Sequence, residues 1–172
     1  MKCVKLYECA KFSNKRTKDI NIESYISTEN MLPNKGGITI AESLPDCQPM
    51  SKYEPHDILL SNIRPYFQKI WYADRIGSCS NDVLVLKSNV KVDSKFLYYV
   101  LSDKTFFDYD TLTSKGTKMP RGTKNAIMKV YSSRYYPPNS AQDSLYPLCL
   151  RFFDREQHKA DSFVEANGRK PL

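Results

Sequence analysis

Asp82-Val83-Leu84-Val85-Leu86 and the later segment Ser94-Lys95-Phe96-Leu97-Tyr98-Tyr99-Val100-Leu101 decide the fold class of this chain. The first is a short, continuous apolar run, which is typical of a strand buried in a core. In the second, apolar residues recur at helical spacing, a later Phe106-Phe107 pair continues the pattern, and Asp93 or Ser94 can serve as the N-cap. The change of period predicts a core strand followed by one or two helices.

Shorter apolar segments before residue 82 predict further strands. Because many short strands precede the helices without regular β-α alternation, we expect an α+β fold. Its sheet should be twisted, mixed or predominantly antiparallel, and accompanied by a few helices. The expected strands are an edge strand at Val4-Lys5-Leu6, then Ser24 to Ser27, Ile38 to Ile40, Asp57 to Ser61, and an amphipathic strand from Tyr66 to Tyr72, with Lys11 to Lys18 as a polar basic loop.

Composition limits the class of protein. The chain has 172 residues and 41% hydrophobic content, which fit one domain, or one domain with an appendage, and exclude wholesale disorder. No apolar run reaches the ~20 residues that cross a bilayer, no basic amphipathic helix suggests a membrane partner, and no signal peptide is evident, so we expect a cytoplasmic protein. Five scattered cysteines without a Cys-x-x-Cys pair, and only two histidines, argue against a disulfide framework or a zinc site.

The formal net charge of +7 points to a polyanionic partner, and much of it is concentrated late in the chain. The segment from Thr111 to Gln142 contains no Asp or Glu but six basic residues: Lys115, Lys118, Arg121, Lys124, Lys129 and Arg134. Within it, residues 116–124 combine cations with Gly116 and Gly122, whose N–H groups can approach a phosphate, and with the hydroxyls of Thr117 and Thr123. An exposed loop with merely solvated lysines is the alternative. We favour DNA contact, with a log-log salt slope of about −5 if all six basic residues met phosphates.

Ser61-Asn62-Ile63-Arg64-Pro65-Tyr66 is a second candidate DNA contact. A buried strand delivers Arg64 to its end, where the guanidinium can fork onto a phosphate or a guanine edge, and Tyr66 or Tyr72 can pack against sugar. Lys69 follows on a face compatible with solvent or ligand. The alternative is that Arg64 pairs with an internal carboxylate such as Asp82.

A catalytic reading finds little support. A metal-dependent nuclease could use Asp46, Asp93 and Lys95, but Lys95 falls at a predicted helix start rather than on a strand beside Asp46. His56 and Asp57 are adjacent, so on a strand they would point to opposite faces. The motifs of phosphate-binding loops, dinucleotide-binding folds and serine hydrolases are absent from the sequence. A free-standing DNA- or RNA-binding regulator is a further alternative.

Four motifs, in their order, resemble a target recognition domain of type I restriction-modification specificity subunits, over about Val4 to Met128. They are residues 25–37, residues 57–66 with Lys69, residues 81–86, and Gly116-Thr117 with Met119-Pro120-Arg121-Gly122 and Ile127.

The resemblance implies a module without an active site or cofactor that reads one half of a bipartite target in double-stranded DNA. Its partners would be methyltransferase subunits that use S-adenosylmethionine and a motor-nuclease subunit that uses ATP and magnesium. The expected DNA-binding residues are Arg64, Lys69, Thr117, Lys118, Arg121, Thr123 and Lys124.

The resemblance ends near Val130. A family member would continue into a long helix that spaces two recognition domains, whereas residues 131–172 show little helical periodicity. We therefore divide the chain into a recognition domain, 1–130, and a divergent, poorly packed tail, 131–172. A frameshift near Val130 would explain the tail, and loss of the spacer helix would impair assembly with the partner subunits.

Overall fold

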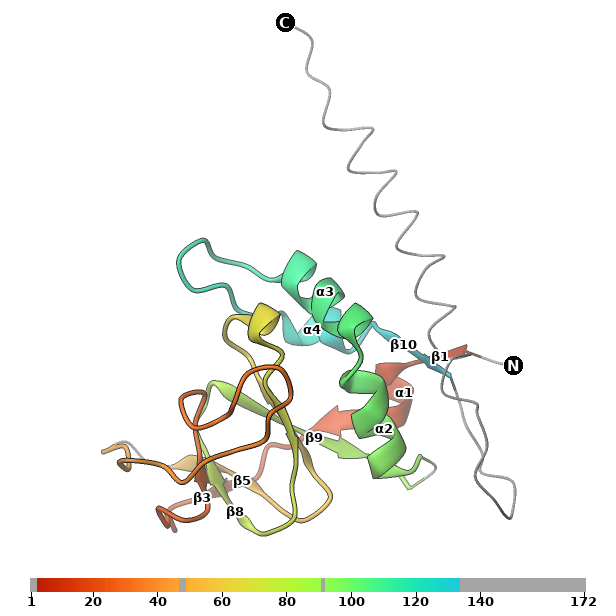
Figure 1. Cartoon of the computed structure of the whole chain (residues 1–172). Helices are drawn as coiled ribbons and strands as arrows, with labels where there is room; N and C mark the ends of the chain where they lie inside the picture. The colour runs from red at the N-terminus through yellow and green to blue at the C-terminus, as the bar shows by residue number, and fades with distance from the viewer. Residues whose placement is uncertain (1–2, 47–48, 91, 134–172) are drawn as a thin grey trace, which may run out of the picture.

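The computed structural model describes residues 3–46, 49–90 and 92–133, and its architecture is α+β, as predicted (Figure 1). These residues form two four-stranded sheets, one of them mixed, a two-stranded ribbon, and short helices gathered to one side. None of the described helices is long and apolar enough to cross a membrane.

The central sheet has the strand order β2 (Ala10–Phe12), β9 (Val83–Ser88), β6 (Ile58–Ser61) and β7 (Ile70–Tyr72), all antiparallel. Pairing sets Leu60 opposite Leu84 and Leu59 opposite Val85. Leu60 and Leu84 belong to the core under the helices, and Leu59 and Val85 to the core shared with the second sheet. Both faces are therefore buried, which is why these strands read as continuous apolar runs.

The second sheet has the order β3 (Arg16–Thr17), β5 (Met50–Tyr53), β8 (Gly77–Cys79) and β4 (Tyr25–Ile26). Strand β4 runs parallel to β8, and the other pairs are antiparallel. Tyr53 is fully buried, and its hydroxyl donates a hydrogen bond to the carbonyl of Ser24. This bond gives the buried hydroxyl a partner and ties β5 to the segment before β4.

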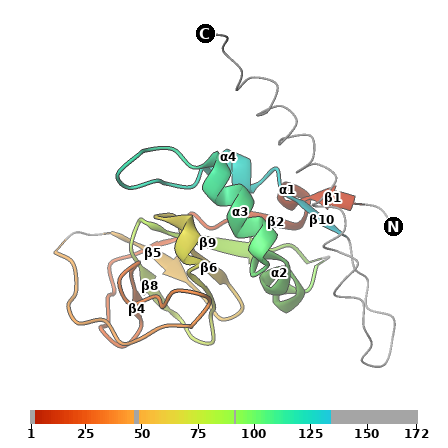
Figure 2. The same cartoon turned by 45° about the horizontal axis from the view of Figure 1, so that its top comes forward.

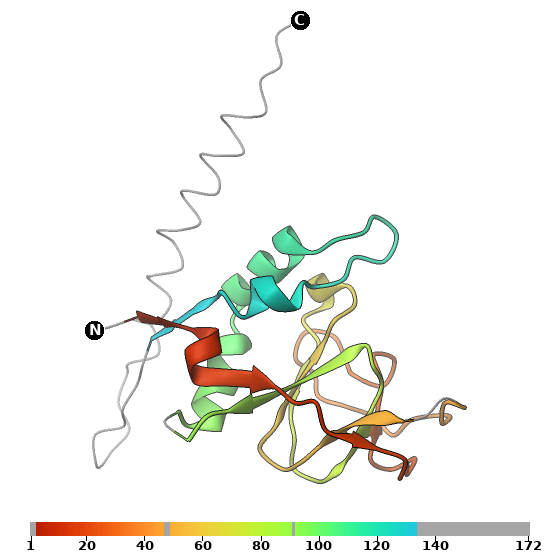
Figure 3. The same cartoon turned by 180° about the vertical axis from the view of Figure 1, so that it is seen from behind.

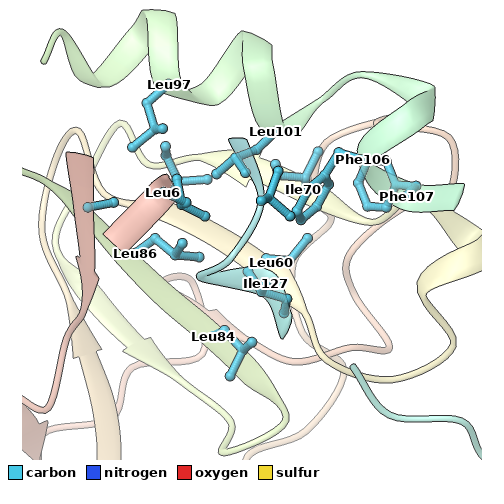
Figure 4. Packing of buried hydrophobic residues seen from close by; sticks show 13 residues of the cluster. Leu6, Leu60, Ile70, Leu84, Leu86, Leu97, Leu101, Phe106, Phe107 and Ile127 are labelled. Carbon is cyan, nitrogen blue, oxygen red and sulfur yellow. The ribbon is translucent and has the colours of Figure 1, made fainter. Parts of the chain in front are cut away.

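Helices α2 (Ser94–Leu101) and α3 (Lys104–Thr113) cover one face of the central sheet (Figure 4). Of the two predicted candidates, Asp93 is the N-cap of α2, with Oδ1 accepting from the backbone N–H of Phe96 at 2.7 Å. Leu97, Leu101, Phe106 and Phe107 pack against the sheet, and each buried side chain of this size contributes about 1.5–3 kcal/mol.

A ribbon of β1 (Cys3–Lys5) and β10 (Tyr131–Ser133) joins the beginning of the chain to the end of its described part. Next to it lie α1 (Leu6–Cys9) and α4 (Lys124–Ile127); Leu6 donates from its N–H to the carbonyl of Val130 at 2.7 Å. Strand β10 thus extends the paired structure beyond the boundary expected at residue 130. The rest of the expected tail, residues 134–172, and any spacer helix lie outside the described residues.

Three local predictions were wrong. Lys11 to Lys18 is not simply a loop, because it contains the end of β2 and all of β3. Ile38 to Ile40 forms a single bridge, Met31 to Ile38, rather than a strand. The Tyr66 to Tyr72 strand begins only at Ile70, because Pro65 starts the 3-10 turn η1 (Pro65–Phe67).

Candidate nucleic-acid interface

The basic loop leaves the end of α3 and projects from the molecule before it returns to α4 (Figures 1 and 2). Lys115 and Arg121 exchange two backbone hydrogen bonds, each 2.9 Å long, which close residues 115–121 into a hairpin. Gly116 has φ +101°, a conformation that side-chain-bearing residues rarely adopt. Thr117, Lys118 and Met119 are exposed between these closing residues, so the hairpin presents a cation to solvent.

The hairpin is held against the Arg64 segment, the second candidate contact. The Arg64 N–H donates to the carbonyl of Pro120 at 2.8 Å, and the Gly122 N–H donates to the carbonyl of Asn62 at 3.0 Å. Ile63 also forms a bridge to Arg121. The structure therefore brings together two segments that are separated by more than fifty positions in the sequence.

The hairpin and the segment from Asn62 to Gln68 together form what we call the edge. A third segment contacts this edge. The turn at Pro33 to Gly36 donates from the N–H of Asn34 to Phe67 and from the N–H of Lys35 to Gln68, at 2.8 and 2.9 Å. Arg64 and Gln68 flank η1 with positive φ values of 50° and 53°, and Asn34 and Lys35 share this backbone conformation. Strained backbone of this kind persists where surrounding contacts over-determine it, so the edge has a defined shape.

The two arginines at the edge have different partners. Arg64 is exposed and forms no ion pair with a carboxylate in the part of the chain that the structure describes. The alternative pairing of Arg64 with Asp82 is therefore not seen. Arg121 takes that place: its Nη2 lies 3.1 Å from Asp82 Oδ1, with the Arg121 side chain 53% exposed. Such an exposed pair contributes at most about 1 kcal/mol, and it orients the guanidinium without burying it.

Several expected phosphate donors have internal partners. Lys69 donates from Nζ to the carbonyl of Thr28 at 2.6 Å, and desolvation, followed by the nearby Arg64 charge, lowers its pKa. The Thr123 hydroxyl donates to the carbonyl of Thr113 at 3.3 Å, and the Gly122 N–H is engaged by Asn62. These groups brace the edge. Thr117 and Lys118 on the hairpin, and Lys124 at the start of α4, are exposed.

Of the two tyrosines expected to contact DNA, one has internal partners and the other is exposed. The Tyr72 hydroxyl is 2.7 Å from Ser94 Oγ and 3.0 Å from His56 Nδ1, so Tyr72 faces α2. Tyr66 is 48% exposed and packs on Phe67, with ring centroids 4.8 Å apart. Sequence reasoning missed Phe67, although it directly follows Tyr66. These two rings form an apolar rim beside Arg64.

A buried carboxylate under the hairpin was also missed. Asp110 is 0% exposed, and neither of its oxygens, nor the nearby buried Asn62 Oδ1, has a hydrogen-bond partner. A Cβ built on Gly122 would lie 2.6 Å from Asp110 Oδ1, so glycine lets the hairpin pass over this group. Desolvation raises the pKa of Asp110 to about 6. The sequence carried a signal, because Asp110 is at i+4 and i+3 from the apolar Phe106 and Phe107.

The candidate nuclease residues do not form a site. Asp93 caps α2, and Lys95 is exposed on that helix, while Asp46 lies in the connection between β4 and β5. Figures 1 and 2 place the part of this connection just before residue 47 and the start of α2 on opposite sides of the molecule. Among the described residues, no group of three His, Cys, Asp or Glu side chains could hold a metal ion.

Known structures resemble this fold. No family model and no curated protein matches the sequence. A chain from a structural study of complex assembly and conformational transition in the type I R-M system matches with TM-score 0.62 and 17% identity, over 96% of this chain and 42% of that one. The HsdS subunit from Thermoanaerobacter tengcongensis matches with TM-score 0.58 and 17% identity, over 96% and 43%, respectively. The type I restriction-modification S subunit from M. genitalium matches with TM-score 0.51 and 14% identity, over 76% and 33%.

Proposed function

We propose that this chain is a DNA-specificity domain that reads one half of a bipartite target. Its fold is that of part of a type I restriction-modification S subunit. The chain spans less than half the length of these relatives. The observation that carries the proposal is the basic hairpin, residues 115–121, fixed beside the exposed Arg64.

The edge has the charge and shape for a duplex. Lys115, Lys118, Arg121, Lys124 and Arg64 are all exposed, and only Arg121 forms an ion pair with a described carboxylate. Contact of all five with phosphates would give a log-log salt slope of about −4.5. The hairpin adds little conformational entropy cost on binding, because its backbone hydrogen bonds already fix its shape.

Base reading is best assigned to the arginines. A guanidinium can donate two hydrogen bonds to O6 and N7 of guanine, whereas the Lys118 ammonium is a point charge that suits phosphate. Asp82 orients Arg121, and the backbone bond to Pro120 fixes Arg64 beside it. We propose that Arg121 and Arg64 select sequence and that Thr117, Lys118 and Lys124 set register on the backbone.

The remaining parts of the proposal follow from the family resemblance. The domain would have no catalytic site or cofactor of its own and would work in the cytoplasm. Methyltransferase and motor-nuclease subunits would supply S-adenosylmethionine, ATP and magnesium chemistry. We further propose that residues 131–172 depart from the family because of a frameshift near Val130; the coding DNA tests this, since a stop codon or an unrelated string in the shifted frame would contradict it.

Fluorescence anisotropy with the full chain and randomised duplex pools tests DNA reading, followed by selection and sequencing of bound duplexes. We expect enrichment of one short sequence motif, which corresponds to one half of a bipartite target. Lys118→Ala should weaken binding to all duplexes and reduce the magnitude of the salt slope by about 0.9. Arg121→Ala should also relax the preference at one position, at a cost of about 1–3 kcal/mol.

Arg75→Ala is the matched control, because Arg75 is also an exposed arginine paired with a neighbouring aspartate, Asp74, but lies in the turn before β8. It should leave affinity and preference unchanged. Binding without any sequence enrichment, or equal affinities for Arg121→Ala and wild type, would refute the proposed function.

A further inference from the structure

A cleft of about 320 Å³ is lined by residues of the β2–β3 segment, β5, β9 and the start of α4. Figure 3 shows the path of the β2–β3 segment below α4. Apolar residues of β9 contribute to its lining. Polar side chains from four separate segments complete it: Ser13, Asn14, Arg16, Ser51, Asn81 and Lys124. Of these, only Lys124 was predicted from the sequence to contact DNA.

The cleft is cationic. Arg16 and Lys124 are its only charged lining residues, and neither forms an ion pair with a carboxylate in the described part of the chain. Other cations, including Lys15, Lys87 and Lys104, do have carboxylate partners. Two cations without a carboxylate partner around a polar cleft favour an anionic ligand.

The Arg16 guanidinium is held in place by neutral groups. Its Nη1 donates to Asn81 Oδ1 and, at 3.2 Å, to Ser51 Oγ. Its Nε and Nη2 groups have no hydrogen-bond partner among residues 3–46, 49–90 and 92–133. The fork geometry of a guanidinium matches two oxygens of a phosphate, and the two neutral contacts fix it without neutralising its charge.

The cleft is continuous with the proposed DNA-binding edge. Asn81, which holds Arg16, precedes Asp82, which holds Arg121. Lys124 lines the cleft and lies three residues after the end of the hairpin, so the cleft adjoins the hairpin through both segments.

We infer that this cleft binds a phosphodiester group of the duplex, with Arg16 as the main ligand, Lys124 as a second charge and Asn14 at the rim. The inference rests on the proposed function, since it extends the same interface from the hairpin to the β2–β3 segment. A volume at the small end of the range for ligand pockets suits a phosphate with its adjoining sugar.

Salt-dependent binding of the full chain to duplex DNA tests the inference. Arg16→Ala should reduce the magnitude of the log-log salt slope by about 0.9, which corresponds to the loss of one phosphate contact. Arg16→Lys should retain the slope, because it keeps the charge. Arg75→Ala is the remote arginine control, and circular dichroism checks that each variant is folded.

Asn14→Asp provides a second variant that does not depend on the hydrogen bonds of Arg16, because Asn14 is exposed. The added carboxylate should repel the phosphate and weaken binding several-fold. If Arg16→Ala and Asn14→Asp both bind like wild type while Lys118→Ala is impaired, the cleft is not a phosphate site and the proposed function stands. If the wild-type chain fails to bind duplex DNA, both proposals fall together.

Discussion

Replacing the buried Asp110 by asparagine should stabilise the protein at neutral pH. The carboxylate lies at 0% exposure under the hairpin, and both of its oxygens lack a hydrogen-bond partner. Asparagine has nearly the same shape, carries no charge, and brings an N–H₂ group that can donate to the unpartnered Asn62 Oδ1. The substitution therefore removes a desolvated charge without opening a cavity.

The magnitude follows from the pKa of Asp110, which desolvation raises from 3.8 to about 6. A difference of about 2 pH units at 1.36 kcal/mol per unit corresponds to roughly 3 kcal/mol. Because the pKa is higher in the folded state, the native protein holds this proton more tightly than the unfolded chain does. Wild-type stability from this group is therefore complete below pH 3.8 and declines as the pH rises to about 6.

Urea unfolding at several pH values, followed by the fluorescence of Trp71, the only tryptophan, measures this effect. Asp110→Asn should differ little from wild type near pH 3.5 and be more stable by roughly 3 kcal/mol at pH 8. Asp108→Asn is the matched control on the same helix; Asp108 is 47% exposed and paired with Lys104, so its change should stay within about 0.5 kcal/mol. The burial argument would be refuted if Asp110→Asn and wild type were equally stable at pH 8. It would also be refuted if their difference in stability did not change with pH.

Three further substitutions test other parts of the structure. Gly122→Ala should destabilise the protein by about 1–3 kcal/mol, because its Cβ would lie 2.6 Å from Asp110 Oδ1, and combining it with Asp110→Ala should recover part of the loss in thermal denaturation. Leu86→Ala should cost about 2–5 kcal/mol in urea titration, since Leu86 is fully buried under the helices, and a cost below 1 kcal/mol would contradict the observed packing. Asp93→Ala should lower stability by about 1 kcal/mol through the lost N-cap of α2 while leaving DNA affinity unchanged, whereas a loss of DNA affinity in a folded variant would place Asp93 in the interface.

Local patterns were enough to predict the elements with strong periodicity. Strands β6 and β9 are apolar on every residue that faces either core, and α2 combines an N-cap with an apolar stripe. Strands β5 and β8 were not predicted, because Met50-Ser51-Lys52-Tyr53 and Gly77-Ser78-Cys79 show little strand propensity. Their pairing with each other and with β3 and β4 stabilises them, and such long-range contacts leave no local signal.

The proposed interface likewise combines features that the sequence predicted with features that it did not. The exposure of the basic loop could be predicted from its glycines and its lack of carboxylates. Three features could not be predicted from the sequence. They are the backbone bonds of the loop to the Arg64 segment, the pairing of Asp82 with Arg121 rather than Arg64, and the internal hydrogen bond of Lys69.

The sequence by itself determined the α+β class, the buried strands and the presence of a cationic loop, because each depends on residue types within a short window. Only the tertiary structure decided which segments meet, and so which cations are left for a ligand and which carboxylate is buried. The physical reason is that hydrogen bonding, ion pairing and desolvation depend on distances between residues far apart in the chain, and the folded packing sets those distances.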